Sequence, residues 1–321
     1  MQKFKILAID TSCDETAAAV TEDTKILSNI IWSQASAHAK FGGIMPTLAK
    51  RMHEERIDFV IAKAIHDSRF TIHDLDAIAV TIGPGLSIAL RVGVEKAKEL
   101  AIKYNKKLIA VNHLEGHLLS CLAQQGIRGN ESGIMDLESS KTLIHASRFP
   151  SLGLVVSGGN TQLILIKKIG EYEILAQTTD DALGEALDKA ARMLGLGYPG
   201  GAILEKMARS ASSGQAKYKL PVPMAGQEGR RMFSYSGLKS SMMRLVASEQ
   251  PLTKDKIYNL AASFQNVAFA HLIRVISFVI HDSRFKIHDL LVGGGVAANV
   301  ELRKRLRKLC KKYGIKLLVP Y

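Results

Sequence analysis

The hydrophobic and polar positions along the first half of the chain predict an alternation of strands and helices. Residues with strand patterning lie on either side of a polar turn, and apolar residues at helical spacing follow them. A glycine-rich turn separates a later strand from its helix. The predicted elements are strands at Lys5–Asp10, Ala17–Thr21, Ile26–Ile31, Ala77–Thr81 and Lys107–Val111, the last expected to be buried, and helices at Pro46–His66 and Ser87–Tyr104.

The second half repeats this order of elements. Gly153–Ile166 predicts a strand, a polar turn and a strand, and a third strand is expected near Tyr172–Gln177. An apolar strand, Asp289–Val292, again runs into glycines, Gly293–Gly295. The predicted helices of this half are Ala182–Leu194, Pro199–Ser210, Leu260–Ile280 and Asn299–Tyr313.

An eleven-residue segment occurs twice and supports an internal duplication. Ile65–Leu75 and Ile280–Leu290 differ only at Thr71 and Lys286, and both precede a strand that ends in glycine. A repeat of this kind predicts two copies of one α/β lobe. We expect a first lobe at residues 1–123, an inserted surface loop at 124–150 and a second lobe at 151–321. Two such lobes resemble the actin, Hsp70 and sugar-kinase architecture (ASKHA), in which a ligand cleft lies between the lobes.

Composition and charge narrow the class of protein. Hydrophobic residues make up 47% and charged residues 23% of the 321 positions, as in a globular protein. No apolar run approaches the length of a membrane-spanning helix, and the N-terminus enters a strand directly. We therefore expect a cytoplasmic protein without a membrane. Three scattered cysteines, Cys13, Cys121 and Cys310, agree with a reducing compartment.

The chain is strongly basic. Lys and Arg number 43 against 30 Asp and Glu, which gives a net charge of +13. Such an excess favours a polyanionic partner, with nucleic acid as the first candidate. The predicted loop Ser212–Phe233 combines basic residues with Tyr218, and Phe233 and Tyr235 follow. These side chains are expected either to line a nucleic-acid groove or to belong to a solvated loop.

Two histidines carry the first candidate chemistry. His113 and His117 stand four residues apart at the start of a predicted helix, so they share one face and can reach one metal ion. The spacing also begins a zinc-protease motif, but Glu115 is not at the position that such proteases require. The alternative is a histidine pair that packs and bonds locally.

Carboxylates and glycines supply further candidates. The turn Thr11–Thr16 carries hydroxyl and carboxylate groups that suit a cation or a phosphate-bound magnesium ion. Gly83–Gly85 could bring backbone N–H groups close to an anion. Near the second lobe's first helix, Asp181, Glu185 and Asp188 predict either a hydroxyl-binding face or ordinary ion pairs with Lys189 and Arg192.

The motifs, taken in order, resemble one known family. The sequence is similar to the bacterial-type tRNA threonylcarbamoyltransferases, the TsaD family, once described as glycoproteases. The resemblance covers nearly the whole chain apart from 124–150. It rests on Asp10–Thr16, His38–Pro46, Gly83–Leu86, His113–His117, Val156–Gln162, Gly195–Gly201, Phe233–Lys239 and Gly293–Asn299.

This resemblance implies a reaction and its site. A threonylcarbamoyl group would pass from threonylcarbamoyl-AMP to the exocyclic amine of the adenosine beside the anticodon of tRNA. His113 and His117 would bind one divalent metal ion, iron or else zinc. Glu15 is our candidate for ordering the amine or a water molecule, from its polarity and position. The residues implied in binding the adenylate are Val155, Val156, Ser157, Gly158, Gly159, Asp188, Gly201 and Asn299.

The resemblance also implies partners, and at one point this sequence departs from the pattern of the family. Members of the family work with tRNA, a smaller actin-like paralogue and a P-loop ATPase. Their third metal ligand is an aspartate beyond the strand that here spans Lys316–Tyr321, where the sequence ends. Two protein ligands hold a metal weakly unless phosphate or water completes the shell. The alternative function is therefore a non-catalytic, actin-like nucleotide-binding subunit with an incomplete metal site; a metalloprotease and a sugar kinase are weaker alternatives.

Overall fold

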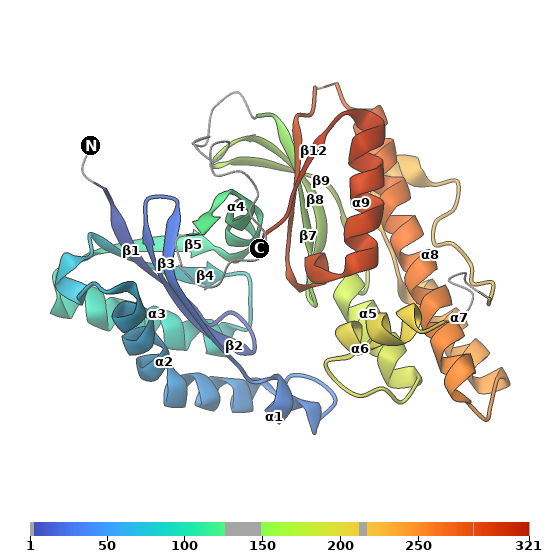
Figure 1. Ribbon diagram of the computed structural model, residues 1–321, viewed down its shortest axis with the longest axis horizontal. Helices are drawn as coiled ribbons and strands as arrows, with labels where there is room; N and C mark the ends of the chain where they lie inside the picture. The colour runs from blue at the N-terminus through green and yellow to red at the C-terminus, as the bar shows by residue number, and fades with distance from the viewer. Residues whose placement is uncertain (1–2, 126–148, 212–216, 285, 321) are drawn as a thin grey trace. The chain divides into compact units, whose positions relative to one another are not determined.

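The computed structural model describes residues 3–125, 149–211, 217–284 and 286–320. The chain divides into two compact units, Met1–Ile144 and His145–Tyr321. They are coloured blue to green and green to red in Figure 1. Of the expected loop 124–150, residues 126–148 lie outside the described part, whereas Gln124–Gln125 form a short strand.

The first unit is built on a six-stranded sheet with the order β5-β4-β1-β2-β3-β6. Strands β1, β2 and β3 form an antiparallel meander, and β4 and β5 add to it in parallel. Its strands are β1 (Lys5–Asp10), β2 (Glu15–Glu22), β3 (Lys25–Ser33), β4 (Ala77–Gly83), β5 (Lys107–Asn112) and β6 (Gln124–Gln125). Its helices are α1 (Ala35–Ala39), α2 (Pro46–Ser68), α3 (Ser87–Lys103) and α4 (His113–Leu119), with 3₁₀ turns η1 (Ile72–Asp74) and η2 (Ser120–Leu122).

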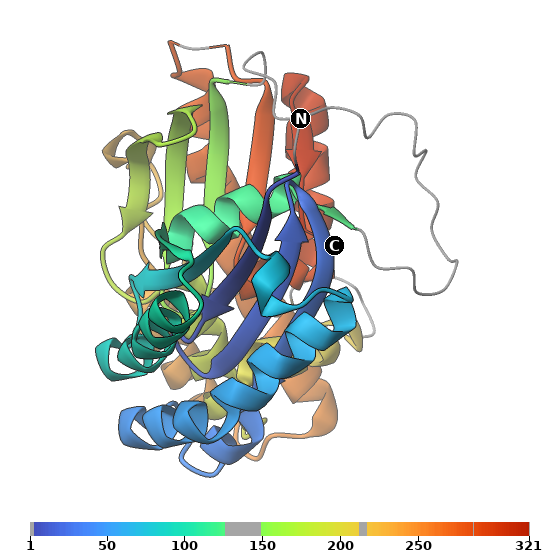
Figure 2. The ribbon, with the colours of Figure 1, turned by 90° about the vertical axis from the view of Figure 1, so that its left-hand side faces the viewer.

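Helices α2 and α3 pack together on one face of this sheet (Figures 1 and 2). Their buried residues, among them Ile57 and Val92, meet Leu7 and Val80 of the strands in one apolar core. Strand β5 corrects our expectation of a buried strand. Within the described part of the chain it is an edge strand that pairs with β4, and most of its residues are exposed.

The second unit has its own six-stranded sheet, with the order β10-β9-β8-β7-β11-β12. Its strands are β7 (Ser151–Val156), β8 (Thr161–Lys168), β9 (Glu171–Thr178), β10 (Met232–Phe233), β11 (Asp289–Gly293) and β12 (Lys316–Leu318). Its helices are α5 (Leu183–Met193), α6 (Gly200–Arg209), α7 (Ser236–Ser248), α8 (Lys254–His281) and α9 (Val300–Tyr313), with 3₁₀ turns η5 (Glu228–Arg230) and η6 (Gly295–Ala298).

Helix α8 is the central helix of the second unit. Its length and composition would suffice to cross a membrane, which corrects the expectation that no apolar run approaches that length. However, 61% of its apolar window is buried within the structure. Phe264, Phe269 and Leu272 are fully buried, and α8 contacts α5, α6, α7 and α9. These contacts account for its apolar composition as that of a core helix.

The two units share one topology. Strands β12-β11-β7-β8-β9 of the second unit repeat the order β5-β4-β1-β2-β3 of the first. The two copies of the repeated segment occupy equivalent places, each between a long helix and the parallel strand that follows it. Thr71 forms a capping box with Asp74 and starts η1. Lys286 has no hydroxyl to do so, and residues 286–288 form no 3₁₀ turn.

Candidate functional site

In the first unit, the end of β1 and the start of α4 bring Asp10 and His113 together. Nδ1 of His113 lies 3.2 Å from Oδ2 of Asp10. The same carboxylate accepts hydrogen bonds from Thr81 Oγ1 at 2.7 Å and from the Ser12 N–H at 2.7 Å. Burial alone would raise the pKa of Asp10, but these hydrogen bonds outweigh it and hold the pKa well below its usual range. Asp10 is therefore ionised and orients the imidazole of His113.

His117 lies one turn further along α4. The ring centroids of His113 and His117 are 4.4 Å apart. Burial, and then the neighbouring His113, lower the pKa of His117 to about 4. A neutral imidazole is the form that binds metal ions. Asn112 caps this short helix by accepting from the Leu114 and Glu115 N–H groups.

The histidine pair can supply two ligands to a cation. Since Nδ1 of His113 faces Asp10, its Nε2 is the nitrogen left for a metal. The residues fit a metal ion in this respect, as a histidine with a carboxylate behind it is a common metal ligand. Within the described ranges, however, no group of three or more His, Cys, Asp or Glu side chains could hold a metal ion.

The carboxylate turn after β1 is fixed by two helices. His53 of α2 is fully buried, and its ring nitrogens bond Thr16 Oγ1 at 2.7 Å and the Cys13 carbonyl at 3.0 Å. On the α3 side, Thr11 Oγ1 bonds the Ala89 carbonyl at 2.8 Å. An added Cβ on Gly93 would lie 2.5 Å from that same Thr11 oxygen, so only glycine permits this approach. The sequence analysis did not identify His53.

Glu15, our candidate for ordering the amine, is the first residue of β2 and is exposed. Although the residue is exposed at the surface, partial loss of water around its carboxylate, followed by repulsion from Asp14 and Asp10, raises its pKa. A raised pKa brings a carboxylate closer to the range in which it can accept and release protons. Glu15 follows the turn that comes after Asp10, and its role stays a prediction.

In the second unit, β7 ends in an open glycine turn. Ser157 N–H donates to the Asn160 carbonyl at 2.8 Å, and Asn160 N–H donates to Ser157 Oγ at 3.0 Å. Gly158 and Gly159 are exposed, and an added Cβ on either would meet nothing within 4 Å. The predicted binding residues Val155 and Val156 are fully buried in β7, so their side chains belong to the core. Only their backbone can contribute to a site.

Asp188 and Gly201, two predicted binding residues, are in direct contact. Oδ1 of Asp188 accepts from the N–H groups of Gly200 and Gly201 at 2.8 and 2.7 Å. The carboxylate thus satisfies two free donors at the N-terminus of α6, where negative charge is favoured. The expected ion pair of Glu185 with Lys189 is present at 2.8 Å.

Asn299 has a structural role that the sequence analysis missed. Its Oδ1 accepts from the Leu302 N–H at 3.0 Å and caps α9. Its Nδ2 donates to Gln265 Oε1 of α8 at 3.0 Å, and only 6% of the residue is exposed. The glycine turn that precedes it packs tightly: an added Cβ on Gly294 would overlap the carbonyl of Val156. The turns after β7 and β11 therefore lie against each other.

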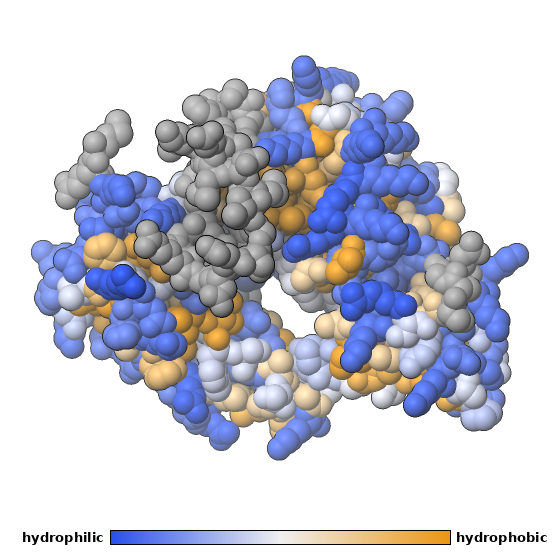
Figure 3. All heavy atoms as spheres, in the orientation of Figure 1, coloured by the Kyte–Doolittle hydropathy of each residue, from blue (hydrophilic) through white to orange (hydrophobic). Residues whose placement is uncertain are grey.

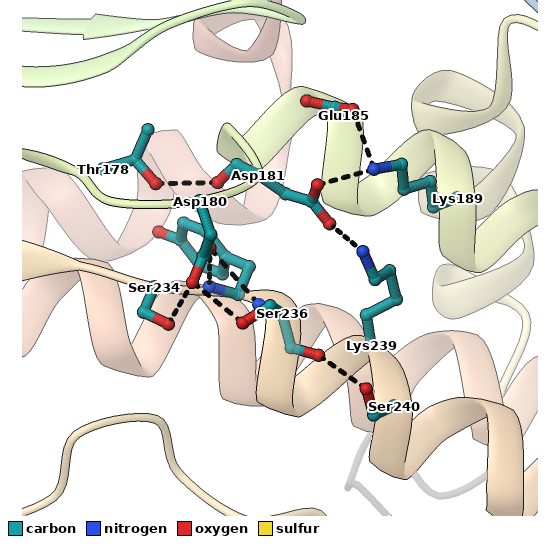
Figure 4. A network of polar contacts seen from close by, with 10 residues as sticks. Thr178, Asp180, Asp181, Glu185, Lys189, Ser234, Ser236, Lys239 and Ser240 are labelled. Atoms are coloured by element: carbon teal, nitrogen blue, oxygen red, sulfur yellow. Dashed lines mark hydrogen bonds and ion pairs between the residues drawn. The ribbon is translucent and has the colours of Figure 1, made fainter.

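A polar network ties α5 to α7 beside these turns (Figure 4). Asp181 accepts from Lys189 at 2.5 Å and from Lys239 at 2.6 Å. Its neighbour Asp180 accepts from the N–H of Tyr235 at 2.7 Å and from the Ser236 hydroxyl at 2.9 Å. Burial would raise the pKa of Asp181, but the two lysines hold it below the usual value.

Phe233 and Tyr235 do not line a nucleic-acid groove in this structure. Both are fully buried, and their rings lie edge-on to His271 of α8. This part of the groove hypothesis is wrong, because both side chains are core residues of the second unit. Tyr218 remains partly buried and donates to Glu249 at 3.1 Å. Residues 212–216 of the predicted loop lie outside the described ranges.

Comparison with known proteins places the chain among close relatives. A family model described as TsaD, tRNA N6-adenosine threonylcarbamoyltransferase, matches residues 25–131 and 134–321. The chain is 41% identical to a tRNA N6-adenosine threonylcarbamoyltransferase of Bartonella tribocorum over 333 residues, covering 99% of this chain and 85% of that protein. It is 40% identical to the protein of the same name from Brucella ovis over 327 residues, with the same coverage.

A more distant likeness concerns the fold alone. The structure is similar to full-length HypF, solved in a phosphate- and nucleotide-bound form, with a TM-score of 0.61 and 13% identity. The match covers 98% of this chain and 52% of that one. The predicted fold class, a duplicated α/β chain of actin- and sugar-kinase-like type, is confirmed.

Proposed function

We propose, because this chain belongs to the tRNA N6-adenosine threonylcarbamoyltransferase family, that it transfers threonylcarbamoyl from threonylcarbamoyl-AMP to tRNA. The acceptor is the exocyclic amine of the adenosine next to the anticodon. One observation on this chain's own residues supports the proposal: Asp10 contacts His113, and His117 lies one helical turn away.

The first unit would hold a divalent metal ion, iron or zinc, through His113 and His117. Asp10 accepts from Nδ1 of His113, so Nε2 is the nitrogen directed to the ion. Phosphate or water oxygens would complete its coordination. When bound, such an ion neutralises phosphate charge and polarises the mixed anhydride.

The second unit would bind the adenylate. The open turn Ser157–Gly159 offers backbone groups at the end of β7, and Gly201 begins α6 beside Asp188. Asp188 would act by holding the Gly200 and Gly201 amides in place. Asn299 already caps α9, so a contact with the ligand would use its Nδ2 in place of the bond to Gln265.

In the transfer, the amine nitrogen bonds the carbamoyl carbon and the bond from that carbon to the phosphate oxygen breaks. AMP leaves with the electron pair, and the amine loses one proton. Because an adenosine amine is a weak nucleophile, its position matters more than a strong base. Glu15, whose pKa is raised, would order the amine or a water that accepts this proton.

The proposed partners are tRNA, a smaller actin-like paralogue and a P-loop ATPase, in the cytoplasm. The net charge of +13 supports a polyanionic substrate. The single long apolar helix of the described chain, α8, is largely buried, which supports a protein that works without a membrane.

The test supplies purified protein with synthetic threonylcarbamoyl-AMP and a tRNA transcript, alone and with the two partner proteins. Mass spectrometry of the digested tRNA should detect threonylcarbamoyladenosine, and metal analysis should find about one ion per chain. The variant H113A/H117A should lose the metal and at least about 100-fold in transfer rate.

The matched control is H66A, which removes an exposed histidine side chain of α2 that contacts its neighbour Asp67. It should leave both metal content and transfer unchanged. Full transfer by H113A/H117A would contradict the proposed role of the pair. Bound nucleotide without transfer under all conditions would support the alternative of a non-catalytic, actin-like subunit.

A further inference from the structure

Helix α9 carries an unusual concentration of positive charge. Residues 300–321 contain eight Lys or Arg and a single acid, Glu301. Lys304, Arg307, Lys308 and Lys311 are exposed, whereas Leu302, Leu306, Leu309 and Cys310 are buried in the core of the second unit. The helix therefore has one apolar face and one cationic face.

The four exposed cations form a continuous stripe. At 100° per residue, positions 304, 307, 308 and 311 fall within an arc of roughly 100° on the helix surface. Lys312 borders it and lies over the ring of Tyr313. Figure 3 shows strongly hydrophilic residues over the part of the molecule where Figure 1 draws α9.

The stripe lacks neutralising partners. Across residues 3–125, 149–211, 217–284 and 286–320, none of its four cations forms an ion pair or a side-chain hydrogen bond. Four exposed cations of the first unit differ in this respect. Lys50, Arg51, Lys63 and Arg91 each pair with a carboxylate one helical turn away. Unpaired like charges along one face repel each other, which a polyanion would relieve.

A groove beside the stripe does not indicate a different partner. It has a volume of about 920 Å³, lies between α8 and α9, and is lined partly by Ile273, Phe278 and Leu309. Its two arginines are already engaged: Arg274 pairs with Glu228 at 2.7 Å and Arg305 with Glu301 at 2.7 Å. Lys308 of the stripe and Lys312 also line its rim, so the cations without ion partners lie along one side of the groove.

We propose that the stripe Lys304, Arg307, Lys308 and Lys311 is a binding surface for the phosphate backbone of the substrate RNA. The inference rests on the proposed function for the identity of that RNA. Asn299 caps the N-terminus of α9, so Lys304 lies roughly 7.5 Å and Lys311 roughly 18 Å from it along the helix axis. RNA held along this stripe would extend toward the glycine turns of the second unit.

Backbone binding through four cations has a defined signature. Each phosphate contact adds to the slope of log K against log salt, by about 0.7 to 0.9 per contact for nucleic acids. It does not depend on sequence, because phosphates carry no base information. Loss of the stripe should therefore weaken binding to every tRNA equally.

The experiment measures tRNA binding to the full chain at several salt concentrations. The variant K304A/R307A/K308A/K311A should weaken binding at least about tenfold and lower the salt slope by about 2 to 3. Alanine favours helix, so α9 should persist, as circular dichroism would confirm. A transcript with the target adenosine replaced by guanosine should be affected to the same degree.

The matched control is K50A/R51A/K63A/R91A, which removes the same charge from cations that already have partners. It should leave the slope of log K against log salt within about 1 of the value for the parent chain. The inference would be overturned if the stripe variant kept the affinity and salt slope of the parent chain, or if both variants lost equally.

The transfer assay separates the two proposals. A chain that binds tRNA through α9 without transferring the group contradicts the proposed function alone. Transfer with an unchanged KM for tRNA in the stripe variant contradicts this inference alone.

Discussion

Oδ2 of Asp10 lies 3.2 Å from Nδ1 of His113, although 103 positions separate the two residues in the sequence. The contact joins the end of β1 to the first residue of α4. It fixes which imidazole nitrogen faces the protein and which faces outward. The proposed metal site of the first unit would therefore depend on Asp10 to orient one of its two histidines.

We predict that Asp10→Asn lowers affinity for Zn²⁺ about 10- to 100-fold, because the uncharged amide orients and polarises His113 less strongly. A competition titration with a chelating dye measures this. Thr81→Val is the control, since it removes one hydrogen bond to Asp10 and leaves the histidine contact. Equal affinities of D10N and the parent chain would exclude an orienting role.

Gly294 should tolerate no side chain. It has a φ of +94°, and an added Cβ would overlap the backbone of Val156. Gly294→Ala is expected to destabilise the second unit by about 2 kcal/mol or more, from the backbone strain and the clash together. Its neighbour provides the comparison: at Gly295 an added Cβ meets nothing within 4 Å. Thermal denaturation should therefore show a clear loss for G294A and little change for G295A.

Asp181 and Glu185 both contact Lys189, but they should differ in importance. Asp181 is 12% exposed in its side chain and also binds Lys239 of α7, whereas Glu185 is 45% exposed. Asp181→Asn should cost about 1 to 3 kcal/mol, since it leaves the partly buried Lys239 without a counter-charge and Lys189 with Glu185 alone. Glu185→Gln should cost at most about 0.5 kcal/mol. Denaturant titration of both variants compares them; similar losses would show that the bridge to α7 is unimportant.

His271 predicts a pH dependence of stability. It is fully buried; burial, and then Arg274, lower its pKa to about 4, while Asp180 and Glu228 act in the opposite direction. The unfolded chain, with a pKa near 6.5, takes up the proton first as the pH falls. Stability is therefore greatest above about pH 6.5 and decreases down to about pH 4, by at most roughly 3 kcal/mol from this residue.

Denaturant titrations at pH 7.5 and pH 5.0 test this expectation. His271→Gln keeps an acceptor for the Ser234 N–H, which bonds Nε2 of His271 at 3.2 Å. The variant should lose less stability between the two pH values than the parent chain does. Identical losses would mean that His271 does not resist protonation in the folded state.

Most of the strand and helix order could be predicted from the sequence, because those elements carry their own periodic signal, but α1 and α7 were not predicted. The helix predicted at Ser87–Tyr104 is observed at Ser87–Lys103, and that at Asn299–Tyr313 begins at Val300 because Asn299 is its cap. Strand β5 was expected to be buried because it is apolar, but burial depends on its place at the sheet edge. That place is a property of the whole sheet.

The candidate site was predictable only where residues adjacent in sequence act together. His113 and His117 lie on one helix, so their spacing sufficed. His53, which holds the carboxylate turn by bonding the Cys13 carbonyl, lies on another helix 40 residues from Cys13. No local sequence pattern predicts this contact. Phe233 and Tyr235 show the reverse problem: aromatic residues beside basic ones suggested an RNA surface, yet tertiary packing buries them.

The repeated segments make correct folding depend on the order in which the two copies become available. Each copy ends in a leucine, Leu75 or Leu290, that is buried in the core of its own unit. Two nearly identical pieces that fit equivalent places can compete for each other's position. During translation the first copy emerges and is packed before the second leaves the ribosome, because domains fold from the N-terminus as they are made. A chain refolded from denaturant has no such order, and both copies are then free at once.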